Sequence, residues 1–203
     1  MIKIKTEDMN KIRLLLVLML LSIPFYTYSQ KVAVKTNLLY GGLTLTPNLG
    51  AEFKLRPKLT LDISGGYNPW NREGSYHDNK KLVHWLIEPE LRYWLCESFN
   101  GHFFGAHLLY SQYNISQHDL PWLLGNHSDK YRFEGNAAGG GISYGYQFVL
   151  GKHWNLEATL GIGYARLWYN KFDCLKCGEK LGKGHRNYFG PTKAGISIIY
   201  IIK

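Results

Sequence analysis

Every second residue is apolar in the stretch Trp154-Asn155-Leu156-Glu157-Ala158-Thr159-Leu160-Gly161-Ile162-Gly163-Tyr164. Successive side chains of a β-strand point to opposite faces, so this period of two predicts a strand with one apolar face. The apolar face would carry Leu156, Ala158, Leu160, Ile162 and Tyr164, and the opposite face Glu157, Thr159, Gly161, Gly163 and Ala165. Alternation does not tell which face points outward, because a soluble barrel buries its apolar face inside.

The same period recurs along the rest of the chain, whereas no segment after the N-terminal region shows a sustained apolar period of 3.6 residues. The runs cover residues 31–43, 47–55, 59–69, 83–95, 101–115, 135–150, 154–169 and 188–202. Each run reaches the roughly 9 to 11 residues with which a tilted strand crosses a bilayer. We therefore expect an all-β protein, an eight-stranded antiparallel up-and-down transmembrane β-barrel.

The connections between these runs differ systematically in length. Residues 56–58, 96–100 and 151–153 form short turns, whereas residues 70–82, 116–134 and 170–187 form long polar loops. The first connection on the long side, at 44–46, is the short exception. Short periplasmic turns and longer extracellular loops are typical of outer-membrane barrels, so the alternation favours a membrane protein over a soluble sandwich.

The N-terminal region has the order of a secretory signal peptide. Basic residues precede an unbroken apolar run at 14–21, and polar residues and a proline follow before Gln30. A membrane-spanning helix would need about 20 apolar residues, and the run is interrupted sooner. We expect a signal peptide at 1–29 and a single barrel domain at 30–203, located in the outer membrane.

Composition narrows the range of partners. The leader carries four of the 24 Lys and Arg residues and two of the 15 Asp and Glu residues, so the remaining chain has 20 against 13 and a formal net charge of +7. Its basic residues are scattered through the predicted loops and do not form a reader of nucleic acid, so we expect no nucleic-acid partner.

Aromatic residues gather near both ends of the predicted strands. At the loop end lie Tyr40, Tyr67, Trp70, Trp85, Tyr110, Tyr113, Tyr131, Phe133, Trp168, Tyr169, Tyr188 and Phe189. At the turn end lie Phe53, Tyr93, Phe103, Phe104, Phe148, Trp154 and Tyr200. Amphipathic rings collect where a bilayer meets water, so two such girdles favour a membrane barrel with its apolar face outward.

With that orientation, charged residues of both signs point into the barrel. The inward candidates are Lys35, Glu52, Asp62, Glu88, Glu90, Arg92, Glu157 and Lys193. Buried charges must be paired, and an eight-stranded barrel is filled by side chains, so we expect an interior charge network that plugs the lumen. Pro89 interrupts this part of the sequence and predicts a β-bulge, because proline lacks a ladder donor.

Several stretches also resemble a known family, the proteins catalogued as domain of unknown function 3575. They are KTNLLY at 35–40, LDISGGYNPW at 61–70, EPELRYW at 88–94, FNGHFFG at 99–105, CLKCG at 174–178 and GPTK at 190–193. The resemblance extends over the whole chain after the leader. It implies an outer-membrane barrel without an assigned reaction, and some members accompany genes for surface fimbriae. No functional residue can be carried over.

An enzymatic role is the main alternative. Some eight-stranded outer-membrane barrels modify lipid A with a His and a Ser near the outer rim, and His107, Ser111 and His118 prompt the same hypothesis here. His107 and Ser111 are four residues apart in a strand, about 13 Å along the chain, and a nucleophile must contact its base. We therefore expect no catalytic residues, with a lipid A-modifying enzyme kept as the alternative function.

Cysteines suggest a second site. Cys174 and Cys177 have the spacing of half a zinc site, with His185 as a third candidate ligand. Export to an oxidising compartment favours a disulfide between Cys174 and Cys177 over a metal. Cys96 is left over in a predicted turn at the opposite end and is expected to be a buried thiol. We expect no bound metal and no cofactor.

The predicted outer loops determine the expected partners. Loop 170–187 is basic, and loop 70–82 adds Arg72, Lys80 and Lys81. Such residues would contact the phosphates of lipopolysaccharide. The expected function is a structural or surface-interaction role for a plugged outer-membrane barrel, linked to fimbria assembly or adhesion, with outer-membrane lipids and fimbrial or other surface proteins as partners.

Overall fold

One antiparallel β-sheet makes up nearly all of the described protein. The computed structural model describes residues 31–70, 80–118, 130–173 and 178–202, so the predicted leader and both cysteines of the predicted disulfide lie outside it. The elements are β1 (Val32–Asn37), α2 (Leu38–Thr44), β2 (Asn48–Arg56), β3 (Leu59–Asn68), β4 (Lys81–Trp94), β5 (Gly101–Ser116), β6 (Tyr131–Val149), β7 (Trp154–Asp173) and β8 (Lys180–Ile202).

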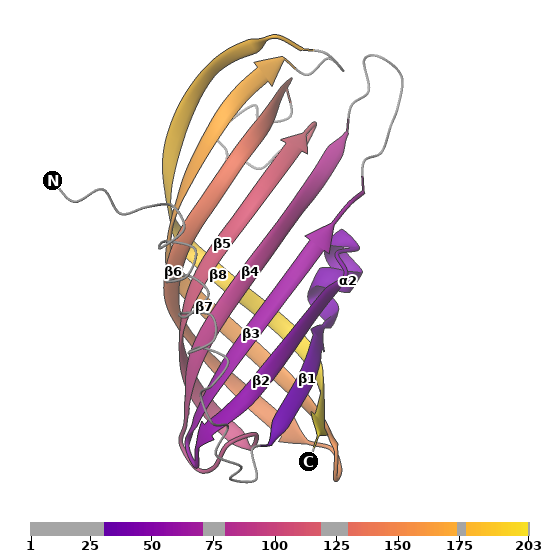
Figure 1. The fold of residues 1–203 in the computed structure, drawn as a ribbon, viewed down its shortest axis with the longest axis vertical. Helices are drawn as coiled ribbons and strands as arrows, with labels where there is room; N and C mark the ends of the chain where they lie inside the picture. Colours follow the sequence, from indigo (N-terminus) through magenta and orange to yellow (C-terminus); the bar gives the residue numbers. More distant parts are fainter. Residues whose placement is uncertain (1–30, 71–79, 119–129, 174–177, 203) are drawn as a thin grey trace, which may run out of the picture.

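The eight strands follow one another around a ring. Each strand pairs antiparallel with its neighbours in sequence, and β1 pairs with β8, which closes the sheet on itself (Figure 1). Short turns join β2 to β3, β4 to β5 and β6 to β7 at one end of the ring, called here the turn end; the opposite end is the loop end. The expectation of an all-β antiparallel protein with eight strands is confirmed. No helix in the described residues is long and apolar enough to cross a membrane.

Side chains alternate strictly between the two faces of the sheet. In β7, Asn155, Glu157 and Thr159 are buried, whereas the intervening apolar residues are exposed or half-exposed. The exposed face of the ring includes Leu49, Ile63, Ile87, Leu91, Leu108, Ile142, Leu160, Ile162, Ile196 and Ile198. The apolar face therefore points outward and the polar face inward, which is the reverse of a soluble core.

The first predicted strand, 31–43, is wrong in its second half. β1 ends at Asn37, whose side-chain Oδ1 accepts a hydrogen bond of 3.0 Å from the Leu39 N–H and so caps α2. At the other end of the helix Leu45 adopts a left-handed backbone with φ of 52°, and its N–H donates to the Tyr40 carbonyl. The helix forms in spite of the alternating sequence, because the Asn37 side chain caps it and competes with the strand ladder for backbone groups.

The predicted loop 170–187 is also wrong. β7 continues to Asp173 and β8 begins at Lys180, and their pairing runs on through Trp168 opposite His185. These strand ends are polar on both faces, so the sequence lacks the apolar alternation by which a strand is recognised, while the backbone ladder with the neighbouring strand still forms.

The β-bulge predicted at Pro89 is absent. Pro89 pairs in regular register with Ile63, and the register of β4 with β5 is the same on both sides of Pro89. Register shifts lie elsewhere: between Lys54 and Arg56 of β2, and between Gly161 and Ile162 and between Lys171 and Phe172 of β7.

The aromatic residues divide between the outside and the inside. Outward rings at the loop end are Tyr67, Trp70, Trp85, Tyr110, Trp168 and Phe189, and those at the turn end are Phe53, Tyr93, Phe104, Phe148, Trp154 and Tyr200. Phe103, Tyr113 and Phe133 were expected in the girdles but are buried inside the ring. The alternation of side chains along a strand (strand parity) explains the difference, since each of these three residues lies at an inward-facing position of its strand.

Candidate functional site: an interior charge cluster

The eight predicted inward charges lie together inside the ring near its turn end. They come from six strands: Lys35 from β1, Glu52 from β2, Asp62 from β3, Glu88, Glu90 and Arg92 from β4, Glu157 from β7 and Lys193 from β8. Every one of them forms an ion pair with another member. We call this group the charge cluster.

Arg92 is the centre of the charge cluster and is fully buried. Its guanidinium nitrogens lie 2.6 Å from Glu90, 2.7 Å from Glu157, 2.9 Å from Glu52 and 3.3 Å from Asp62. The planar fork of an arginine presents five N–H donors in fixed directions, so one side chain can bind carboxylates from four strands. Arg92 thus ties together opposite parts of the ring.

Two lysines complete the pairing. Lys35 Nζ lies 2.7 Å from Asp62 Oδ2, 3.6 Å from Glu52 and 3.7 Å from Glu157. Lys193 Nζ contacts Glu88 and lies 3.1 Å from Glu90 Oε2. Charges removed from water need partners of opposite sign, and each lysine here pairs with more than one carboxylate.

Neutral donors surround the carboxylates. Thr60 donates to Glu52 at 2.6 Å, Thr159 donates to Glu157 at 2.8 Å, Ser64 donates to Asp62 at 3.0 Å, and Ser143 donates to Glu90. These hydroxyl residues were not among the predicted site residues. Their signal is nevertheless in the sequence, because Thr159 and Ser64 each stand two positions from an inward acid and so share its face.

Aromatic rings close the interior on the turn-end side of the charge cluster. The Phe103 ring lies beneath the Arg92 guanidinium, 4.4 Å from its Cζ, and packs on Trp94 with ring centroids 4.8 Å apart. Trp94 Nε1 donates to Thr60 at 2.9 Å, which links the rings to the cluster. A Cβ on Gly145 would approach Phe103 to 2.3 Å, so glycine is needed there for the ring to fit.

This packing leaves almost no free space at the level of the charge cluster. The remaining cavity beside Lys35, Glu88 and Lys193 has a volume of about 40 Å³, room for only a few water molecules.

Of the residues of the enzymatic alternative, Ser111 and His118 line one cavity toward the loop end, whereas His107 and Ser111 hydrogen-bond different partners. His107 Nε2 hydrogen-bonds Thr192 Oγ1 at 2.9 Å, whereas the Ser111 hydroxyl donates to the Trp85 carbonyl at 2.8 Å. Within the described ranges no group of three or more His, Cys, Asp or Glu side chains has the arrangement of a metal site.

A family model described as "Protein of unknown function (DUF3575)" matches residues 14–202, nearly the whole chain. The chain belongs to the DUF3575 family. The family model covers all eight strands and every member of the charge cluster. No curated protein and no solved structure gives a significant match to this DUF3575 chain.

The cysteines of this DUF3575 protein separate into two groups. Cys174 and Cys177, expected to form a disulfide, lie outside the described residues, as do the possible zinc contacts of that pair. Cys96 lies in the turn between β4 and β5 and is exposed, so the expectation of a buried thiol is wrong.

Proposed function

We propose that this DUF3575 protein is exported and functions as a small transmembrane β-barrel of the outer membrane, with a plugged interior and a structural or surface-interaction role. The inverted distribution of side chains carries this proposal: large apolar residues cover the outside of the ring, and charges fill the inside. In water this outer surface would be an aggregation hazard, whereas in hydrocarbon it is the favourable surface.

The position of the apolar band between two sets of outward aromatic rings supports a membrane setting. On β7 the band lies between the outward rings of Trp154 and Trp168, and on β8 it lies between Tyr200 and Phe189. Outer-membrane barrels show an apolar band of about 25 Å flanked by aromatic girdles. Closure of the sheet between Val32–Asn37 of β1 and Ser197–Ile202 of β8 also satisfies backbone groups that an open edge would expose to lipid.

The loop end has the chemistry of a cell-surface partner site. Lys180 and Lys183 are exposed on β8 beyond the apolar band. Cationic side chains above an outward aromatic girdle would meet the phosphates of lipopolysaccharide. A role in adhesion or fimbria assembly would use the same end of the molecule.

Cell fractionation and gel mobility test the membrane proposal. The expressed chain should be recovered with outer membranes, and it should migrate faster on gels before boiling than after, because a closed ring of strands resists detergent unfolding. A western blot of fractionated cells, loaded with and without boiling, provides both readouts. Recovery as a soluble periplasmic monomer with one mobility would contradict the proposal.

Planar bilayer recordings test whether the interior is plugged. The charge cluster and the Phe103 and Trp94 rings block the lumen, so the purified protein should produce no discrete conductance steps. Insertion is verified separately by co-flotation of the protein with lipid vesicles. Regular conductance steps from a protein that co-floats would show that the lumen conducts ions.

A further inference from the structure

A second interior space lies between the charge cluster and the loop end. Its volume is about 550 Å³, within the range of about 300–1,000 Å³ found for small-molecule sites. Its lining is mainly apolar and includes Leu82, Leu86, Leu109, Ile115, Ala137 and Leu167 from the strands and Tyr40 and Leu43 from α2. We call this space the apolar cavity.

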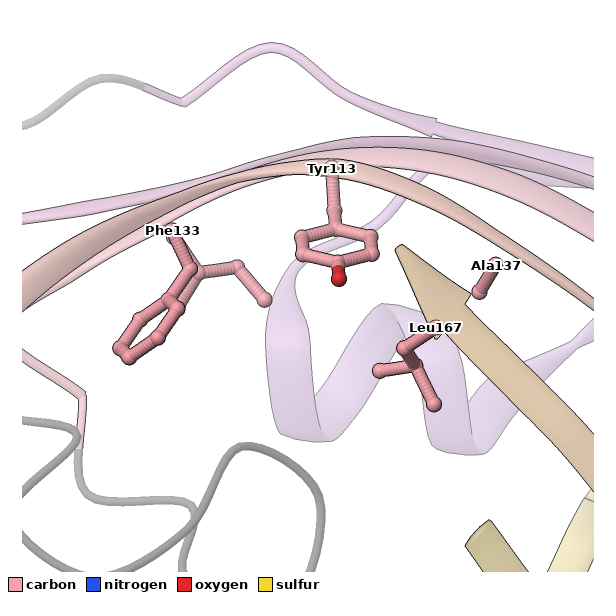
Figure 2. Close-up of a cluster of buried hydrophobic side chains, with 5 residues drawn as sticks. Tyr113, Phe133, Ala137 and Leu167 are labelled. Atoms are coloured by element: carbon pink, nitrogen blue, oxygen red, sulfur yellow. The ribbon is translucent and has the colours of Figure 1, made fainter. Parts of the chain in front are cut away.

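One polar group in the apolar cavity has no partner. Tyr113 of β5 is only 7% exposed, and its hydroxyl forms no hydrogen bond within the described structure. Figure 2 shows the Tyr113 ring projecting inward from the sheet beside Ala137 and Leu167, with the hydroxyl at its inner tip. A buried hydroxyl without a partner is costly, so its position indicates an acceptor that a ligand would supply.

The wall of the ring changes character beside the apolar cavity. β1 has 6 residues and β8 has 23, so only Ser197–Ile202 of β8 pair with β1. Toward the loop end, the edge of β8 that faces away from β7 pairs with no strand in the described ranges. In place of a continued β1 the chain forms α2, which lies next to β8 (Figure 1).

α2 packs beside β8, and hydrogen bonds tie the C-terminal end of the helix to the β3 side of the ring. Asn68 donates to the Thr44 carbonyl at 2.9 Å, and Trp70 Nε1 donates to the Leu45 carbonyl at 2.6 Å. On the side of β8, the side-chain amide nitrogen Nδ2 of Asn37, the residue just before the helix, donates to the Ala194 carbonyl at 3.0 Å. The wall between α2 and β8 therefore lacks the continuous ladder that joins every other neighbouring pair of strands.

We propose that the apolar cavity takes one acyl chain of a membrane lipid, which enters sideways from the outer leaflet between α2 and β8. Both borders of this entrance line the cavity, Tyr40 and Leu43 on α2 and Tyr188 and Pro191 on β8. Leu43 lines the cavity and is also 79% exposed, as expected for a side chain at an opening. A carboxyl or ester oxygen of the lipid accepts the hydrogen bond from Tyr113.

The level of the apolar cavity suits a chain from the bilayer. Leu86 and Leu109 line its lower part, and their chain neighbours Trp85 and Tyr110 point outward in the aromatic girdle of the loop end. The entrance thus lies near the interface between hydrocarbon and headgroups if the proposed membrane setting holds, and this inference rests on that setting.

Photo-crosslinking in vesicles tests the inference. The folded chain is reconstituted in phosphatidylethanolamine and phosphatidylglycerol vesicles that contain a trace of phospholipid with a diazirine at the end of one acyl chain. After irradiation, crosslinked residues are located by mass spectrometry of peptides. We expect crosslinks on outward residues such as Leu108, Ile142 and Leu160, and additional crosslinks on inward Leu86 and Leu109, which line the lower part of the apolar cavity where the end of the chain would lie.

A matched pair of variants identifies the apolar cavity as the site. Leu109→Trp fills the cavity and should reduce the inward crosslinks at least fivefold while leaving the outward ones unchanged. Leu108→Trp places the same bulk on the lipid-facing side of the same strand and should preserve the inward crosslinks. Unchanged inward crosslinks in Leu109→Trp would overturn the inference.

The pattern of labelling separates the two proposals. Outward crosslinks without inward ones would overturn the acyl-chain site and leave the membrane barrel standing. An absence of crosslinks on both faces would contradict the membrane barrel itself, and the acyl-chain site with it. Inward crosslinks that do not depend on residue 109 would likewise overturn the acyl-chain site and leave the membrane barrel standing.

Discussion

Replacing Arg92 by Met is expected to destabilise the protein by at least about 3–5 kcal/mol, the usual cost of removing one partner from a buried ion pair. Arg92 alone contacts four carboxylates, Glu52, Asp62, Glu90 and Glu157, so its loss leaves a group of like charges in the interior. The measurement is chemical unfolding of the protein folded in lipid vesicles, followed by the difference between folded and unfolded gel mobility.

Two further variants separate the role of the cluster from a general effect of losing an arginine. Arg56→Met removes an exposed arginine at the end of β2 and should change the unfolding free energy by no more than about 0.5 kcal/mol. Adding Glu52→Gln and Glu157→Gln to Arg92→Met removes two of the orphaned charges and should recover part of the lost stability. If Arg92→Met is as stable as Arg56→Met, the charge cluster does not hold the ring together.

The charge cluster was accessible from sequence because strand parity fixes the face of each residue. Glu88, Glu90 and Arg92 stand at every second position of β4, so one orientation of the strand places all three inside. Glu157 follows from the same rule in β7. What parity cannot provide is the pairing, since which acid Arg92 reaches depends on the register between strands and on side-chain length.

The apolar cavity was not predicted, and the reason is again local. Its wall depends on α2, which forms where alternation indicates a continued strand; the Asn37 cap and the left-handed Leu45 decide otherwise. Its lining also depends on Tyr113, an inward residue that was counted among the girdle residues from its height in the strand alone. Height along the strand and parity have to be combined before an aromatic residue can be assigned to a membrane girdle.

The two interior regions of the ring differ in chemistry and in packing. Near the turn end, ion pairs from six strands fill the lumen and join opposite walls. Toward the loop end, apolar side chains leave a space, and the wall beside it contains a short helix. Under the proposed membrane setting, a filled turn end below a cavity suits a site that binds from the membrane or the outer surface better than a conduit between the two sides.

Leu160→Arg is expected to cost about 2–4 kcal/mol of unfolding free energy in lipid vesicles, the penalty for arginine at the bilayer midplane of a barrel. Leu160 is 64% exposed and lies on β7 between the outward rings of Trp154 and Trp168, in the middle of the apolar band. The matched control is Leu150→Arg, because Leu150 is 67% exposed but lies in the turn after β6, beyond the aromatic girdle of the turn end. Near the interface the cost should fall to about 0–1 kcal/mol.

In a soluble ring the two leucines, equally exposed to water, would tolerate arginine equally well. Equal unfolding free energies for the two variants would therefore contradict a bilayer around this protein, whereas a difference of at least about 1 kcal/mol, with Leu160→Arg the less stable, would place Leu160 in hydrocarbon.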